Sequence, residues 1–406
     1  MEYTKHQLSN GIQLVHKHTD SKVAHLGVFI NAGSRDEFEE EHGLAHFIEH
    51  LLFKGTSKRR AYHIISRLED VGGEINAYTT KEETCIYASF LKEDYNRALE
   101  LMSDILFNSS FPEKEIKKEK AVILDEINSY KDSPSELIFD EFEELVFNHA
   151  PIGRNILGSV RNIALFNKES IHRFMDRNYT NDKIVITSVG DIHFDKLLSF
   201  IATYFSAGAN NANNRQRKGH YNYIPRFKEI EKNTFQAHCV LGNMAYDLKD
   251  EKRIPLVLLN NVLGGPNLNS RLNLTLREKL GLAYHVESNF QPYSDTGIFN
   301  IYFGTDRENL KKCMNQVQIE LRKLRENKLG EQQLKKAKRQ LIGQVAIGAD
   351  NNESIMLANG KSYMIYSRID SFEEIKEKID RITSDDLQWI ANDIFNPEKL
   401  SFLIYR

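Results

Sequence analysis

The residues with the clearest chemical potential are His46, Glu49 and His50, which fall within five positions of one another. On a helix with 3.6 residues per turn, residues four apart share a face, so both imidazoles can reach one ion. This arrangement suits zinc, whose bonds to nitrogen are about 2.0–2.1 Å long. A carboxylate beside the ion can accept a proton from a water molecule whose pKa zinc lowers to about 7. The pattern therefore predicts a zinc site able to activate water.

The spelling His-x-x-Glu-His is the inverzincin signature, but three fixed positions can also arise by chance in a chain with 14 histidines. Two structural interpretations compete with the zinc site. The histidines could face solvent on a surface helix, or one could be a core residue that hydrogen-bonds a backbone carbonyl. An apolar flank would bury this helix and hold its polar face still; it consists of Leu44, Phe47, Ile48, Leu51 and Leu52.

A catalytic zinc needs a third protein ligand and an open coordination position. The segment that begins at Pro112 is a predicted helix with several carboxylates, namely Glu115, Glu119, Asp125 and Glu126. Glu119 and Glu126 are two helical turns apart and share a face. Most helical glutamates are solvated, so this spacing does not choose among the four carboxylates.

The composition is that of a globular protein with two domains. A length of 406 residues exceeds one ordinary core, and a net charge of −3 gives no basic surface for nucleic acid. Three widely spaced cysteines do not form a disulfide framework. We find no signal-peptide pattern and no apolar run long enough to span a membrane, so a cytoplasmic location is the default expectation.

The hydrophobic periodicity divides the chain into two similar halves. Strands are expected at 23–30 and 74–91, helices at 61–71 and 93–108, and a closing strand at 183–189. An Asn- and Gly-rich stretch at 207–222 is typical of a linker. The order of elements then recurs, but no second His-x-x-Glu-His is present.

We therefore predict an α+β fold of two homologous α/β-sandwich domains, each a mixed, mostly antiparallel sheet packed with helices. The N-terminal zinc-binding domain would span 1–206, the linker 207–222 and the C-terminal domain 223–406.

Four separated motifs resemble the pitrilysin–insulinase family of zinc metallopeptidases, closest to the single-chain branch that includes the mitochondrial processing peptidase. They are Gly-Leu-Ala-His-Phe-Ile-Glu-His at 43–50 with Phe-Lys-Gly-Thr at 53–56, Gly-Gly-Glu-Ile-Asn-Ala-Tyr-Thr at 72–79, Ser-Arg-Leu at 270–272 and Leu-Arg-Glu-Lys-Leu-Gly-Leu-Ala-Tyr at 276–284. The resemblance covers nearly the whole chain and implies two halves that face each other as half a clamshell. A glycine-rich run usual in the family is replaced here at 264–269.

The resemblance also implies roles for individual residues. The family's third zinc ligand follows the second histidine by 76 positions, which is Glu126, and a supporting glutamate seven residues earlier is Glu119. Asn76 and Ala77 would contact the peptide as an added strand. Arg277 and Tyr284 would reach substrate and transition state from the second half; without the resemblance they would be a helix ion-pair residue and a strand core residue.

These features predict a zinc-dependent endopeptidase with one Zn²⁺ per chain that cuts unfolded peptides inside a closed chamber. His46, His50 and Glu126 would bind zinc, and Glu49 would be the general base. By resemblance, the chain forms a homodimer or a heterodimer with a related subunit. Four alternatives are a subunit that needs a partner to complete its active site, a structural subunit, a zinc-holding peptide-binding module and a zinc hydrolase of other substrates. The intact zinc motif disfavours the structural subunit, and the strand motif disfavours the last.

Overall fold

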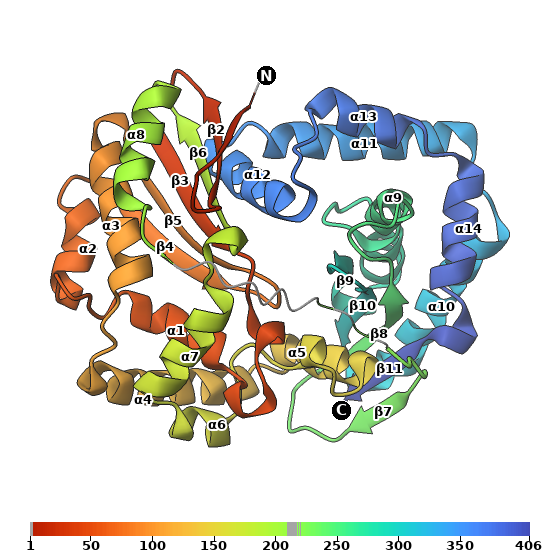
Figure 1. Ribbon diagram of the computed structural model, residues 1–406. Helices are drawn as coiled ribbons and strands as arrows, with labels where there is room; N and C mark the ends of the chain where they lie inside the picture. Colours follow the sequence, from red (N-terminus) through yellow and green to blue (C-terminus); the bar gives the residue numbers. More distant parts are fainter. Residues whose placement is uncertain (1–2, 209–216, 218, 220) are drawn as a thin grey trace. The chain divides into compact units, whose positions relative to one another are not determined.

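A computed structural model describes residues 3–208, 217, 219 and 221–406 (Figure 1). Most of the predicted linker, at 209–216, 218 and 220, lies outside the described residues. The chain forms two compact units that do not follow a single cut. The first contains the described parts of 1–127, 155–216 and 347–370, and the second contains those of 128–154, 217–346 and 371–406.

The first unit is built on a six-stranded sheet with the order β1-β2-β6-β3-β5-β4. All neighbours are antiparallel except β2 and β6, which are parallel. The strands are β1 Thr4–Gln7, β2 Gln13–His18, β3 Val23–Ile30, β4 Glu74–Thr79, β5 Thr84–Leu91 and β6 Ile184–Gly190.

The second unit repeats this topology in a five-stranded sheet with the order β7-β11-β8-β10-β9. Its strands are β7 Phe227–Ile230, β8 Ala237–Ala245, β9 Ala283–Pro292, β10 Gly297–Thr305 and β11 Ser401–Tyr405. The only parallel pair, β7 with β11, stands where β2 and β6 stand in the first sheet. Strand for strand, β4 therefore corresponds to β9, and each is the edge strand. The predicted α+β duplication is confirmed.

The helices also repeat in order. Those of the first half are α1 Leu44–Leu52, α2 Ala61–Glu69, α3 Tyr95–Asn108, α4 Glu113–Lys131, α5 Pro134–Phe147, α6 Val160–Leu165, α7 Lys168–Asn178 and α8 Phe194–Tyr204. Those of the second half are α9 Arg253–Gly264, the π-helix η6 Asn273–Lys279, α10 Leu310–Glu326, α11 Glu331–Gly348, α12 Asn352–Tyr366, α13 Phe372–Asp380 and α14 Ser384–Ile394. Three of these helices, α6, α8 and α12, were not predicted from the sequence.

In the first unit, alternate side chains of each strand enter two different apolar layers. Leu26 and Val28 of β3 join the main core, which includes residues of α1, α3, α7 and α8. Phe29 points to the other face, where it packs with Met356 of α12 (Figure 1). The sheet is thus covered on one face by helices of its own half and on the other by α12, a helix of the second half.

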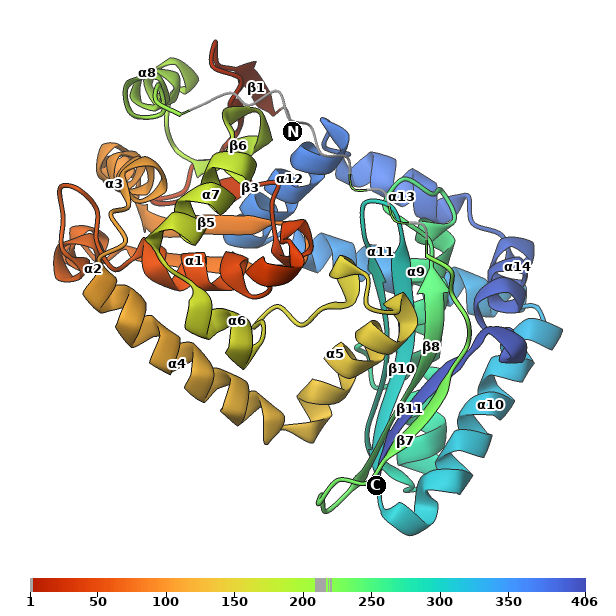
Figure 2. The same cartoon turned by 60° about the horizontal axis from the view of Figure 1, so that its bottom comes forward.

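The second unit has the same two layers. Leu241 and Phe299 belong to the larger core with α9, α10 and α14. Val240 and Leu403 belong to the smaller layer, which α5 closes with residues such as Phe142 (Figure 2). Because α5 and α12 hold equivalent places in the two halves, the halves exchange one helix reciprocally.

The start of α1 is fixed by a buried acid. The Glu37 side chain accepts hydrogen bonds from the backbone N–H groups of Gly43, at 2.9 Å, and Ala45, at 2.8 Å, and the residue is 1% exposed. A carboxylate at a helix N-terminus satisfies unpaired donors and opposes the helix dipole. Gly43 has a φ of +99°, and a Cβ there would lie 2.7 Å from Cα of Gly158. The orientation of α1 therefore depends on this capped turn.

Two further observations concern the described residues as a whole. The three cysteines are unpaired and buried. Among the described helices, none has both the length and the apolar character needed to cross a membrane.

We expect Glu37→Gln to lower the free energy of unfolding by about 1–3 kcal/mol, because an amide cannot accept both N–H groups at once. Thermal or urea unfolding of the metal-free protein measures this. Glu40→Gln is the matched control, since it removes the same charge from an exposed residue of the same segment. Equal loss in both variants would show that the cap does not stabilise α1.

A second prediction concerns His16 of β2, which is 2% exposed and pairs through Nδ1 with the Ser188 hydroxyl at 3.1 Å. Burial, assisted by neighbouring His18, lowers the pKa of His16 from 6.5 to about 4. Between these values the unfolded chain binds the extra proton, so the folded protein loses stability as the pH falls. The contribution amounts to about 3 kcal/mol.

His16→Gln should therefore flatten the dependence of unfolding free energy on pH between about 6.5 and 4. His18→Gln, on the same strand with a side chain 55% exposed, removes only the smaller of the two causes and should flatten this dependence much less. Urea unfolding at several pH values makes the comparison. Parallel curves for wild type and His16→Gln would contradict the prediction.

Candidate metal centre and catalytic site

Helix α1 carries both predicted histidine ligands on one face. The ring centroids of His46 and His50 are 4.6 Å apart, and His46 is 8% exposed. The apolar flank of the same helix is buried in the main core of the first unit, as expected. His46 and His50 therefore share a face of α1, as their spacing predicted, and the opposite face of this helix is fixed by packing.

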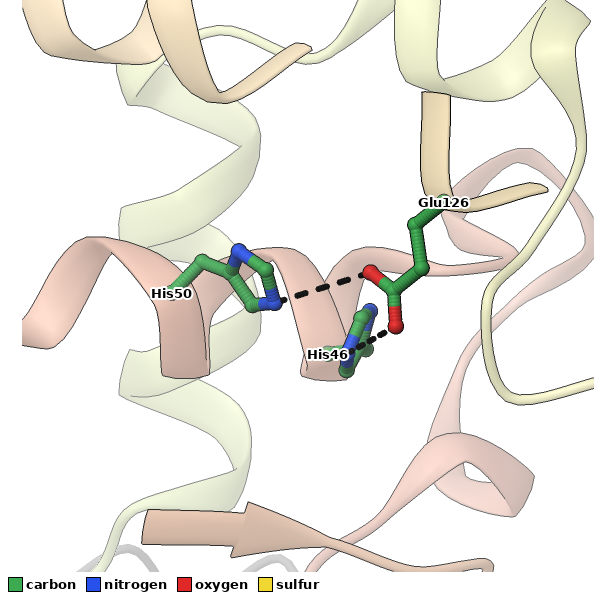
Figure 3. Close-up of side chains that lie close together, drawn as sticks. All are labelled: His46, His50 and Glu126. Atoms are coloured by element: carbon green, nitrogen blue, oxygen red, sulfur yellow. Dashed lines mark ion pairs between the residues drawn. The ribbon is translucent and has the colours of Figure 1, made fainter. Parts of the chain in front are cut away.

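Helix α4 brings Glu126 to the two imidazoles (Figure 3). Its Oε1 lies 3.9 Å from Nε2 of His46, and its Oε2 lies 3.8 Å from Nε2 of His50. These distances are too long for hydrogen bonds. One ligand atom from each residue lies within 4.8 Å of the others, the only such group among the described residues.

Two imidazole nitrogens and a carboxylate oxygen are a donor set that zinc prefers, and three protein ligands leave a fourth position open. Tetrahedral zinc with bonds near 2.0–2.1 Å would separate its ligand atoms by about 3.3 Å, slightly closer than here. The residues therefore fit the metal, with small side-chain adjustments.

The protonation state of His46 also suits a metal ligand. Burial, assisted by neighbouring His50, lowers the pKa of His46 from 6.5 to about 4. At neutral pH the imidazole is therefore uncharged, which is the form that binds metals.

Glu119 supports the site without joining the group of three. Its Oε2 lies 3.2 Å from Nδ1 of His50, which directs Nε2 of that ring toward Glu126. Its Oε1 pairs with Nζ of Lys54 at 2.9 Å. Such second contacts fix the orientation and tautomer of a ligating histidine.

The other two candidate carboxylates of α4 are not part of this cluster. Glu115 pairs with Lys118 at 3.1 Å, one turn along the helix surface, and Asp125 is absent from the group of possible ligands. The geometry thus distinguishes carboxylates that the sequence spacing left open.

Glu49 lies on the same helix as the histidines and next to the edge strand. Burial raises the pKa of the Glu49 carboxyl group, and the carboxylate of Glu126 raises it further, while the neighbouring Thr79 and His50 oppose the shift. A raised pKa favours a group that must both accept and release a proton. Thr79, at the end of β4, was not identified from the sequence.

Asn76 and Ala77 lie in the middle of β4, opposite Tyr87 and Ile86 of β5. Within the described residues, β4 pairs with β5 alone, so its outer edge is the edge of the sheet. Helix α1 packs against this strand. The structure therefore places the predicted peptide-binding strand beside the helix that carries Glu49.

Arg277 and Tyr284 belong to the second unit. Arg277 lies on the π-helix η6, a rare form often found at functional sites, with Nε 3.9 Å from the Glu278 carboxylate. Tyr284, on the edge strand β9, is 60% exposed and donates a hydrogen bond to Asp306 at 3.2 Å. The expectation of a strand core residue, made without the family resemblance, is wrong for Tyr284.

Sequence comparisons cover both halves of the chain. Residues 13–160 match the family model described as "Insulinase (Peptidase family M16)". Residues 166–341 match the model described as "Peptidase M16 inactive domain". An uncharacterized zinc protease of Bacillus subtilis is 32% identical over 98% of this chain and 97% of its own length. Another from Rickettsia felis is 34% identical over 93% of this chain and 91% of its own length.

Solved structures of similar fold cover the whole chain. A protease from Helicobacter pylori has a TM-score of 0.92 with 20% identity, and the alignment spans 100% of this chain and 99% of that one. A Pseudomonas fluorescens structure described as a peptidase M16 inactive domain has a TM-score of 0.91 with 21% identity, over 100% and 98%. Together with the sequence matches over both halves, these findings show that the chain belongs to the insulinase (M16) family of zinc peptidases.

Proposed function

We propose that this chain is a zinc-dependent endopeptidase that hydrolyses unfolded peptides, with one zinc ion bound per chain. The observation that carries the proposal is the convergence of His46, His50 and Glu126 on a site whose helix α1 also carries the half-buried Glu49. The naming of relatives as zinc proteases supports the choice of metal.

His46, His50 and Glu126 would hold the metal, with Glu119 orienting His50. When bound, zinc supplies Lewis acidity, which lowers the pKa of a water molecule and polarises the carbonyl of the peptide bond to be cut. The open fourth position is what separates such a site from a structural one.

Glu49 would move the protons of the reaction. Its carboxylate accepts a proton from the attacking water and then donates it to the leaving amine. Its raised pKa helps the second step.

The edge strand β4 would bind the substrate by strand addition, with Asn76 and Ala77 contacting its backbone. A peptide can pair in this way only when it is extended, so folded proteins would be poor substrates. Backbone pairing also depends little on side chains, which suits a range of sequences.

Arg277 and Tyr284 would stabilise the negative charge that develops on the carbonyl oxygen. Their exposure leaves them available for such contacts, and Asp306 fixes the Tyr284 hydroxyl. We further propose that cleavage takes place inside a closed chamber and that the chain forms a homodimer or a heterodimer with a related subunit. If Arg277 and Tyr284 cannot serve within one chain, a partner would have to supply them.

Glu49→Gln should keep zinc but lose cleavage by about 10²–10⁴-fold, because the amide cannot accept a proton. Glu126→Gln should lose zinc as well. Cleavage of an unstructured peptide library, read by mass spectrometry alongside metal content, distinguishes these outcomes.

Asp125→Asn is the matched control, since it changes a carboxylate of α4 outside the cluster and should retain both zinc and activity. Undiminished cleavage by Glu49→Gln would refute the assignment of the base. Loss of zinc and activity in Asp125→Asn, but not in Glu126→Gln, would refute the ligand assignment.

A further inference from the structure

Lys54 forms an ion pair with Glu119, the carboxylate that also contacts His50. It follows α1 by two positions, and its Nζ lies 2.9 Å from Oε1 of Glu119. The Glu119 side chain is 6% exposed and that of Lys54 is 32% exposed. The two oxygens of Glu119 are thus shared between Lys54 on one side and His50 on the other.

A buried carboxylate requires a compensating charge or hydrogen bonds. Lys54 supplies such a charge to the buried side chain of Glu119, at a distance of 2.9 Å.

The segment that carries Lys54 is held firmly on both sides. Its backbone N–H donates to the carbonyl of Leu51 at the end of α1, at 3.0 Å. On the other side, the Thr56 hydroxyl donates to Asp104 of α3 at 2.8 Å, and Ser57 N–H donates to the Asn108 carbonyl at 2.8 Å.

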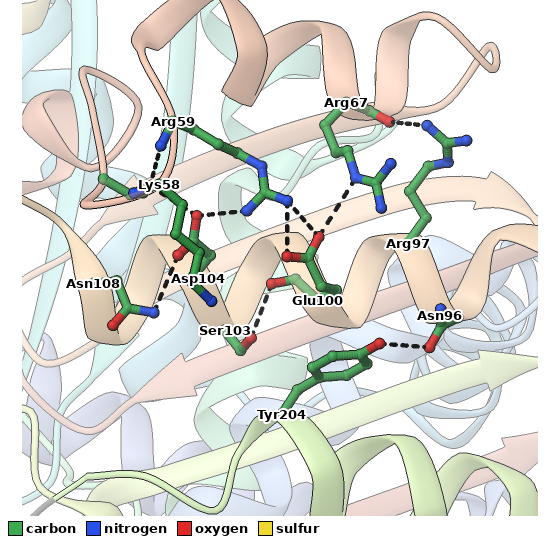
Figure 4. Close-up of polar contacts among 11 residues, drawn as sticks. Lys58, Arg59, Arg67, Asn96, Arg97, Glu100, Ser103, Asp104, Asn108 and Tyr204 are labelled. Carbon is green, nitrogen blue, oxygen red and sulfur yellow. Dashed lines mark hydrogen bonds and ion pairs between the residues drawn. The ribbon is translucent and has the colours of Figure 1, made fainter.

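A second group of contacts reinforces this anchor (Figure 4). The Arg59 guanidinium lies between two acids of α3, 2.6 Å from Asp104 and 2.8 Å from both oxygens of Glu100. Asp104 is 1% exposed. The backbone on either side of Lys54 is therefore fixed to α1 and α3.

We propose that Lys54 is a positioning residue of the metal centre, which acts through Glu119. By fixing one oxygen of Glu119, it aims the other at Nδ1 of His50 and so keeps Nε2 of that ring directed to the metal. This inference rests on the proposed zinc site but not on cleavage of any particular peptide.

The test is the zinc affinity of Lys54→Met, measured by competition with a chelator. The loss expected is about 10–100-fold, typical when an outer partner of a metal ligand is removed. Lys54→Arg, which keeps the charge, should recover most of the affinity. Lys58→Met is the matched control, since it removes a lysine charge from an exposed position of the same segment and should bind zinc like wild type.

A double-mutant cycle shows whether Lys54 acts through Glu119. In the background of Glu119→Gln, adding Lys54→Met should weaken zinc binding little further. Thermal unfolding of the metal-free variants shows whether a loss of zinc affinity comes from misfolding. Retained zinc affinity in Lys54→Arg would also show that the charge at this position, and not the fold, is responsible.

Two results would overturn the inference: wild-type affinity in Lys54→Met, or a full additional loss in the Glu119→Gln background. Neither depends on activity. If wild type binds zinc but cuts no peptide, the proposed function fails while the role of Lys54 is still decided.

Discussion

A single metal ion accepts ligands only within narrow distances, so three side chains from two helices must converge to a few tenths of an ångström. His46 and His50 share α1, which settles their mutual spacing. Glu126 comes from α4, 76 residues after His50, so its position depends on how α1 and α4 pack. The Glu37 cap, the buried flank of α1 and the contact between Glu119 and His50 all restrict that packing.

The two halves of the chain share a fold but differ in the chemistry that we propose for them. Apart from β1, both sheets have the same strand order, and each is closed by the equivalent helix of the other half, α12 or α5. Their cores use apolar side chains that need no metal, so the second half could fold without ligands. It retains an edge strand, β9, on which Tyr284 is exposed, and β9 corresponds to β4, the proposed substrate strand.

Much of the fold followed from local patterns in the sequence. Alternating strands, amphipathic helices and the repeated order of elements predicted an α+β duplication, since each of these signals is short-range. Helix α12 escaped prediction because it buries residues such as Met356 against the first sheet, which follows from long-range packing. The helix exchange is equally invisible in the sequence, for the same reason.

The candidate site, like the fold, could be predicted from the sequence only in part. Spacing alone paired His46 with His50, but it could not choose Glu126 among the carboxylates of α4. The family resemblance pointed to Glu126, whose carboxylate lies near both imidazoles. Lys54 lay within a motif that the resemblance quoted, yet its partner Glu119 is 65 positions away, and only the fold joins them. Thr79 was likewise part of a recognised motif without an expected contact to Glu49. The closer relation to the single-chain processing-peptidase branch remains a prediction.

The most direct test of zinc-dependent cleavage is to add zinc back to the metal-free chain and to follow cleavage of an unstructured peptide as zinc is titrated. We predict no cleavage without metal. As zinc is added, the cleavage rate should rise to a plateau at about one equivalent, as expected for one three-ligand site. Cleavage by the metal-free chain, or binding of one zinc with no cleavage by the chain alone, would contradict this prediction.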